Sequence, residues 1–123
     1  MKFRNQTTFY FIRHGETPSN AHNIAQGIHI DDYLDTQGIL QVQYLANVIA
    51  HLQLDILYTS HLKRAEETAA IIKNSLAEPI AILHDSRLQE RDFGSLTGKS
   101  EEEIEKRRRY IIKQLERETK ILN

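Results

Sequence analysis

The chain of 123 residues is long enough for one domain with a single modest core. Its 16 Lys and Arg residues nearly balance its 17 Asp and Glu residues, so no overall field attracts nucleic acid or an anionic membrane. The lack of cysteine excludes disulfides, thiolate catalysis and cysteine-ligated metals. No hydrophobic signal region follows Met1 and no apolar run could span a bilayer, so we expect a cytoplasmic protein.

The first part of the chain predicts a strand, a loop and a helix. The β-branched and aromatic run 8–12 is typical of a buried strand, which would end at Arg13. Residues 19–35 are polar and predict an excursion over the surface. Apolar residues at helical spacing then predict a helix over 36–52, with Thr36 as its cap.

The middle of the chain repeats this alternation of strand and helix. Residues 55–59 predict a second buried strand, and a helix follows from His61 to about Leu76 with Ser60 as N-cap. Residues 79–83 predict a third strand, whose proline stands at the start, where a missing donor is tolerated.

A loop over 84–99 precedes a long charged helix from about Glu101, and Ser100 with Glu103 matches a capping box. We expect residues 1–123 to form one α/β domain, three-layered (αβα) with a mainly parallel sheet and crossover helices.

The residues that carry chemistry follow the first predicted strand. In open α/β sheets, ligands bind outside the carboxyl ends of the strands, which is where His14 stands. Imidazole is nucleophilic near neutral pH, and Gly15 lets a ligand approach the backbone. Arg13 supplies a planar donor fork that matches phosphate oxygens. This pattern predicts a histidine that attacks phosphorus.

Two later segments complete this prediction. Arg64 lies in the first turn of the helix after the second strand, near the positive end of its dipole, where it could form an anion clamp with Arg13. The third strand leads to residues 88–94, in which a carboxyl group with a pKa raised by a semi-buried, anionic site could donate a proton to a leaving alcohol.

These motifs, namely residues 13–17 with Asn20, residues 60–68 and residues 90–98, resemble in their order those of the histidine phosphatase superfamily, which includes the cofactor-dependent phosphoglycerate mutases. The resemblance implies a phosphoglycerate mutase-like fold and a reaction without a metal or other cofactor. It also implies roles for eight residues. His14 would be the phosphorylated nucleophile, Arg13 and Arg64 would bind the phosphoryl group, Glu90 would donate the proton, and the substrate would lie against Thr17, Asn20, Gln26 and Gly27.

The resemblance favours hydrolysis of a small phosphorylated metabolite, because residues 98–100 run directly into a helix, as in the phosphatases of the family. A mutase-type phosphotransferase and a non-catalytic phosphate-binding or partner-binding remnant are the alternatives. The family's second catalytic histidine, which stands beside a glycine, has no match: no histidine except His14 is followed by glycine. We therefore expect a domain cut before that histidine, with weak or no activity, whose open sheet edge a homodimer could cover.

Simpler interpretations exist for single residues. Arg64 could be a solvated helix residue paired with Glu66 or Glu67, and Glu90 could pair with Arg87 or Arg91. Other charged groups also have a simpler interpretation, which we favour. The acidic and histidine residues of the polar stretch lack metal-ligand spacing and predict a plain loop; these are His22, His29, Asp31 and Asp32.

The basic run 106–109 does not predict a nucleic-acid site. Its residues stand four positions after acidic ones, in the order Glu102–Lys106, Glu103–Arg107 and Glu105–Arg109, which indicates a salt-bridged helix. Apolar residues form a stripe on that helix, namely Ile104, Ile111, Ile112 and Leu115.

Overall fold

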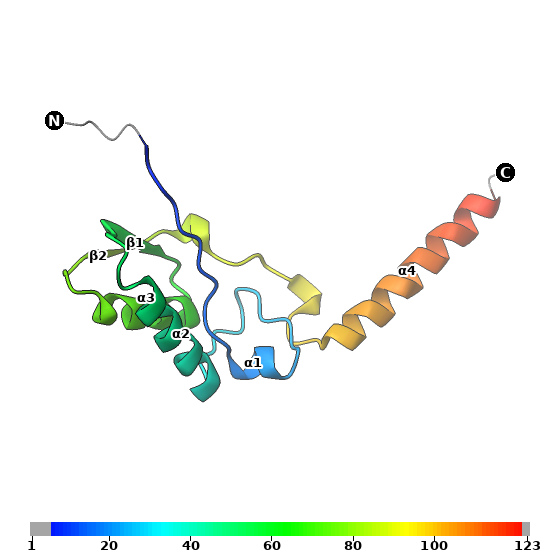
Figure 1. The fold of residues 1–123 in the computed structure, drawn as a ribbon. Coiled ribbons are helices and arrows are strands. Elements are labelled where there is room, and N and C mark those ends of the chain that lie inside the picture. Colours follow the sequence, from blue (N-terminus) through cyan, green and yellow to red (C-terminus); the bar gives the residue numbers. More distant parts are fainter. Residues whose placement is uncertain (1–5, 122–123) are drawn as a thin grey trace.

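A computed structural model describes residues 6–121, with side chains to residue 117. Figure 1 shows the elements in chain order. They are α1 (Pro18–Ala21), α2 (Thr36–Ile49), β1 (Ile56–Thr59), α3 (Lys63–Ser75), β2 (Ala81–His84), the short 3-10 turns η1 (Ser86–Leu88) and η2 (Gly94–Leu96), and α4 (Glu101–Ile121).

The two strands form a parallel pair that α3 connects. Ile56 pairs with Ala81 and Thr59 pairs with His84, so both strands end at the same edge. The Asp85 amide donates to the Thr59 carbonyl at 2.9 Å and extends the pairing by one step. This strand–helix–strand unit confirms the expected α/β class with a parallel sheet.

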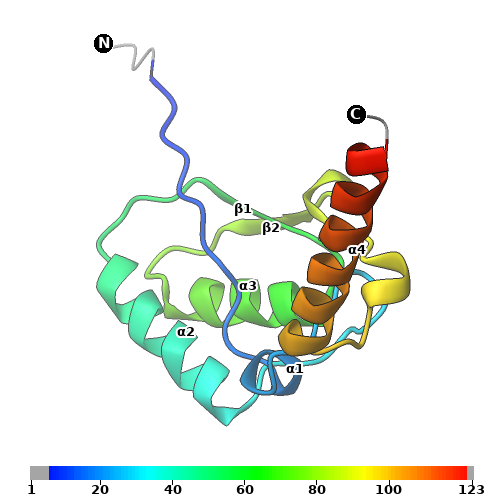
Figure 2. The ribbon, with the colours of Figure 1, turned by 90° about the vertical axis from the view of Figure 1, so that its right-hand side faces the viewer.

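The core lies between the strands and the two helices on one side of them (Figure 2). Its buried residues come from α2, α3 and the approach to α2; they are Leu34, Val42, Ala46 and Ile72. Leu57 of β1 packs against this cluster, whereas Tyr58, which points the other way, is 55% exposed. The second predicted strand is therefore buried on one face only, because no helix among residues 6–121 covers the other.

The predicted first strand is wrong in the structure as described. Residues 8–12 belong to no helix or strand, and Phe9 and Phe11 are 72% and 92% exposed (Figure 1). The two rings lie on the same side of the chain, 6.4 Å apart. Aromatic and β-branched residues favour extended backbone, but a strand also needs a hydrogen-bonded neighbour, and among residues 6–121 this segment has none.

Helix boundaries differ from the predicted ones because capping groups differ. Asp35, and not Thr36, caps α2, since its carboxylate accepts from the Gly38 amide at 2.7 Å, and the helix ends at Ile49. The next helix, α3, begins at Lys63, two residues after the predicted start. Ser60 is not its N-cap.

A carboxylate from the loop replaces the predicted Ser60 cap. The N-cap residue of α3, Leu62, makes no side-chain hydrogen bond, and Asp31 Oδ1 accepts from the Lys63 amide at 2.7 Å. The third strand was predicted over 79–83. It begins and ends later, as β2.

The expected capping box and charge pattern are present at α4. The Ser100 amide donates to Glu103 Oε2 at 2.9 Å, and the Glu103 amide donates to Ser100 Oγ at 3.2 Å. The ion pairs Glu102–Lys106 and Glu105–Arg109 are formed at 2.7 and 3.1 Å. The third expected pair is not formed, because Arg107 donates to Ser95 Oγ at 3.2 Å instead.

The helix α4 extends away from the other elements (Figure 1). Its apolar stripe includes exposed residues, among them Ile111 and Ile112. None of the helices over residues 6–121 combines the length and the hydropathy that crossing a membrane requires.

Candidate active site

Gly15, which follows His14, lies between two helices. A Cβ on Gly15 would stand 2.5 Å from the Gly38 carbonyl oxygen of α2, so only glycine allows this approach. On the side of α3, the Gly15 amide donates to Thr68 Oγ1 at 3.2 Å. These contacts hold the backbone next to the predicted nucleophile.

Gly38 was missed as a residue that shapes the site. A Cβ there would stand 2.0 Å from the Glu16 carbonyl oxygen, so α2 and the predicted nucleophile segment touch backbone to backbone. A signal for it exists in the sequence. A glycine in the first turn of a predicted helix lowers the stability of that helix by about 1 kcal/mol relative to alanine. Such a glycine often marks a place of close packing.

The His14 ring is oriented by its own neighbour. His14 Nδ1 lies 2.7 Å from the carbonyl oxygen of Gly15. A carbonyl oxygen only accepts hydrogen bonds, so Nδ1 carries the proton and Nε2 of the neutral ring has a free lone pair. This is the tautomer that an Nε2 nucleophile requires.

The surroundings of this ring favour its neutral form. Burial lowers the pKa of His14 below its ordinary value, and the hydrogen bond to Gly15 opposes that effect. The charges of Arg64 and Arg13 lower the pKa further, and the charge of Glu90 raises it. The structure therefore brings together all four residues predicted as catalytic, close enough for their charges to act on one imidazole.

Arg64 is not a solvated helix residue. It is 2% exposed, and its Nη1 and Nη2 donate to the carbonyl oxygens of Ile30 and Gly27 at 3.0 and 2.9 Å. Burial lowers its pKa, and the carboxylates of Asp31, Glu90 and Asp32 oppose this. Two of the five N–H groups of the guanidinium thus bond to the loop over residues 27–30, and three N–H groups are left for another acceptor.

Three of the four predicted substrate-side residues form one hydrogen-bonded cluster around Gln26. The hydroxyl of Thr17, which is fully buried, donates to Gln26 Oε1 at 3.0 Å, and Asn20 Nδ2 donates to the same oxygen at 3.2 Å. Thr17 and Asn20 also form the capping box of α1. Gln26 Nε2 donates to Asp32 at 3.3 Å, and Asp32 in turn accepts from Ser19.

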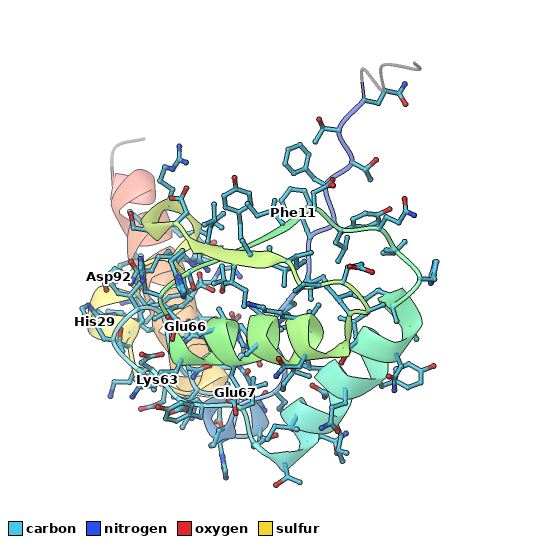
Figure 3. The ribbon with its side chains drawn as sticks, turned by 90° about the vertical axis from the view of Figure 1, so that its left-hand side faces the viewer. Phe11, His29, Lys63, Glu66, Glu67 and Asp92 are labelled. Atoms are coloured by element: carbon cyan, nitrogen blue, oxygen red, sulfur yellow. The ribbon has the colours of Figure 1, made fainter. Side chains whose placement is uncertain are left out.

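Gly27 lies apart from this cluster, against the segment that contains Glu90. It has a φ of +56°, and a Cβ there would meet the Phe93 ring at 2.8 Å and the Arg91 carbonyl at 2.9 Å. His29 and Asp92, which Figure 3 shows side by side, join the same two segments at 3.1 Å. The loop and the Glu90 segment therefore contact each other next to the site.

Glu90 differs from the expectation in one respect. It was expected in a semi-buried place, and the structure leaves it exposed, because no described helix covers residues 89–92. Its carboxylate accepts from the Arg91 amide at 2.9 Å. Arg87, its proposed ion-pair partner, binds Asp85 at 2.5 Å instead and lowers the pKa of that carboxyl to about 2.

A family profile described as the histidine phosphatase superfamily (branch 1) matches residues 9–121. The chain belongs to this superfamily. Residues 9–121 include all three motifs on which the resemblance was based.

Relatives within the superfamily include phosphatases and mutases. The fructose-2,6-bisphosphatase TIGAR of Xenopus laevis is 35% identical over 95 residues, which are 76% of this chain and 34% of the frog protein. The 2,3-bisphosphoglycerate-dependent phosphoglycerate mutase of Bartonella bacilliformis is 34% identical over 104 residues, or 81% of this chain and 50% of the mutase.

The solved structure of Bacillus stearothermophilus YhfR aligns with a TM-score of 0.68 and 35% identity, over 76% of this chain and 45% of YhfR. The histidine phosphatase fold is thereby confirmed. The chain spans between about a third and half of the length of these relatives.

Proposed function

We propose that this chain hydrolyses phosphate monoesters of small metabolites through a phosphohistidine formed on His14. The observation that carries the proposal is the 2.7 Å contact between His14 Nδ1 and the Gly15 carbonyl, in a ring whose pKa is lowered by burial. A neutral imidazole with its lone pair on Nε2 is the form that attacks phosphorus. Membership of a superfamily with phosphatases among its named members supports the same reaction.

The reaction would proceed in two displacements. Nε2 of His14 attacks phosphorus, the bond between phosphorus and the ester oxygen breaks, and Glu90 gives its proton to the leaving alkoxide. A water molecule then attacks the phosphohistidine, passes a proton back to Glu90 and releases phosphate. Arg13 and the unoccupied donors of Arg64 would neutralise charge on the phosphoryl oxygens.

The test is the formation and turnover of phosphohistidine with p-nitrophenyl phosphate. We expect the chain to form acid-labile phosphohistidine and to release nitrophenol. The variant His14→Ala should do neither. His51→Ala is the matched control, because His51 is exposed and bonds only to the Val48 carbonyl near the end of α2. Unchanged hydrolysis by His14→Ala would show that the nucleophile is wrong.

We propose a low rate for the chain alone. No second His-Gly pair occurs in the 123 residues, and removing one preorganised donor to a developing charge costs about 10²–10³-fold in rate. A rate equal to that of full-length phosphatases of the family would contradict this. Transfer to a phosphoglycerate instead of water would identify a mutase, and vanadate binding without any phosphohistidine would identify a binding remnant.

A further inference from the structure

The hydroxyl of Thr68 joins two parts of the site that are far apart in sequence. Thr68 is 5% exposed and lies on α3 one turn after Arg64. Its Oγ1 donates to the Arg64 carbonyl at 2.8 Å and accepts from the Gly15 amide at 3.2 Å. One hydroxyl proton and one lone pair are thereby both used.

The first of these bonds is ordinary and the second is not. A threonine within a helix commonly donates to the carbonyl four residues earlier. The bond from Gly15 spans 53 residues and reaches the residue after His14. Without the hydroxyl, the amide of Gly15 would be buried with no acceptor, which is costly in a protein interior.

Gly15 transmits this contact to the imidazole. Its amide is fixed by Thr68, and its carbonyl accepts the Nδ1 proton of His14. The place where a Cβ of Gly15 would stand is blocked by Gly38 and Val42 of α2, each with an atom under 3 Å away. The Gly15 peptide therefore has little freedom, and the ring that bonds to it shares this restriction.

We propose that Thr68 is a positioning residue, which keeps the imidazole of His14 at a fixed position relative to Arg64 through the backbone of Gly15. The proposal rests on the proposed role of His14 as nucleophile. Thr68 itself touches no substrate. Its hydroxyl fixes the separation between the attacking atom and the arginine that would bind the phosphoryl group, because it bonds to the backbone of both segments.

Three variants of the full chain test this. Thr68→Val removes the hydroxyl at nearly constant volume, and Thr68→Ser keeps it. Ile72→Val is the control for loss of packing, because Ile72 is buried one turn further along α3 and has no bond to Gly15. Far-UV circular dichroism confirms that each variant is folded. If Thr68→Val does not fold, Thr68→Ala is compared with Thr68→Ser by the same measurements.

The first measurement is the rate of phosphohistidine formation from p-nitrophenyl phosphate. Misplacing a reacting group by about 1 Å costs about 10²-fold, so we expect a loss of that order in Thr68→Val, in kcat and not in KM. Thr68→Ser and Ile72→Val should keep the rate of the unaltered chain. Equal losses in Thr68→Val and Ile72→Val would overturn the proposal, because the effect would then be general packing.

The second measurement needs no turnover. We expect faster hydrogen exchange at the Gly15 amide, and ring ¹⁵N shifts of His14 that indicate mixed tautomers, in Thr68→Val alone. Unchanged exchange and shifts in that variant would overturn the proposal. If the unaltered chain forms no phosphohistidine but these NMR differences appear, the proposed function fails and the positioning contact stands.

Discussion

At the scale of single residues, the site depends on groups that touch the backbone beside His14. The sequence placed Arg13 and His14 at the end of a predicted strand and Arg64 in the first turn of a predicted helix, and the resemblance to the superfamily added Glu90; their catalytic roles stay predictions. Thr68 and Gly38 were not predicted, since they come close to His14 only through contacts of Gly15 and Glu16 with α3 and α2. Sequence spacing alone does not show such contacts.

The charges around His14 predict opposite effects of two substitutions on its pKa. Removing a neighbouring positive charge in Arg13→Gln should raise the pKa of His14, and removing a negative charge in Glu90→Gln should lower it. In Glu90→Gln it should therefore lie further below the ordinary value of about 6.5, because the charge of Glu90 opposes the lowering that burial causes. An NMR titration of the His14 ring measures this.

The direction in which the pKa of His14 moves also sets how the rate of phosphohistidine formation depends on pH. The neutral ring is the nucleophile, so a higher pKa moves the acidic limit of the reaction in Arg13→Gln to higher pH. For Glu90→Gln, the change in the pKa of His14 is measured by NMR titration and not by turnover, because this variant also removes the proposed proton donor. Shifts of the same sign in both variants would mean that these charges do not act on His14 as described.

At the scale of elements, the accuracy of prediction follows the range of the interactions involved. The helices α2, α3 and α4 and the strands β1 and β2 were predicted from local spacing, and Ser100 caps α4 from an adjacent position. The N-terminus of α3 was misplaced because Asp31, more than thirty residues earlier in the chain, supplies its acceptor. The strand over residues 8–12 was wrong because pairing requires a non-local neighbour.

The Asp31 cap predicts a graded loss of stability. Asp31→Ala removes the acceptor for the Lys63 amide and should lower the free energy of unfolding by about 0.5–2 kcal/mol. Asp31→Asn keeps an acceptor and removes only the charge near the helix N-terminus, which is worth about 0.3–1 kcal/mol. Urea unfolding at an unchanged m-value measures both.

Asp55→Ala is the control for this series, since Asp55 is an exposed acidic residue just before β1. We expect it to leave the free energy of unfolding within about 0.5 kcal/mol. If Asp31→Ala cost no more than Asp55→Ala, the loop carboxylate would not be a cap. If Asp31→Asn cost as much as Asp31→Ala, the charge and not the hydrogen bond would matter.

At the scale of the whole molecule, apolar surface is distributed unevenly. One face of the strand pair packs on α2 and α3, and the other exposes large side chains such as Tyr58 and Leu83. The N-terminal segment and the helix α4 both extend away from the core (Figure 1), and Phe11 of that segment is exposed. Large apolar side chains are therefore exposed on three separate parts of the chain, namely the strand pair, the N-terminal segment and α4.

Phe11→Ala distinguishes this arrangement from the buried strand predicted from the sequence. An exposed aromatic ring contributes little, so the free energy of unfolding should change by less than about 0.5 kcal/mol, whereas a buried one would cost about 3–5 kcal/mol. Ile72→Ala, in the core, should cost about 2–5 kcal/mol and shows that the assay responds to packing. Chemical unfolding at several protein concentrations is the measurement. A large loss for Phe11→Ala at every concentration would contradict the exposed segment, and a loss that grows with concentration would show that a second copy covers it.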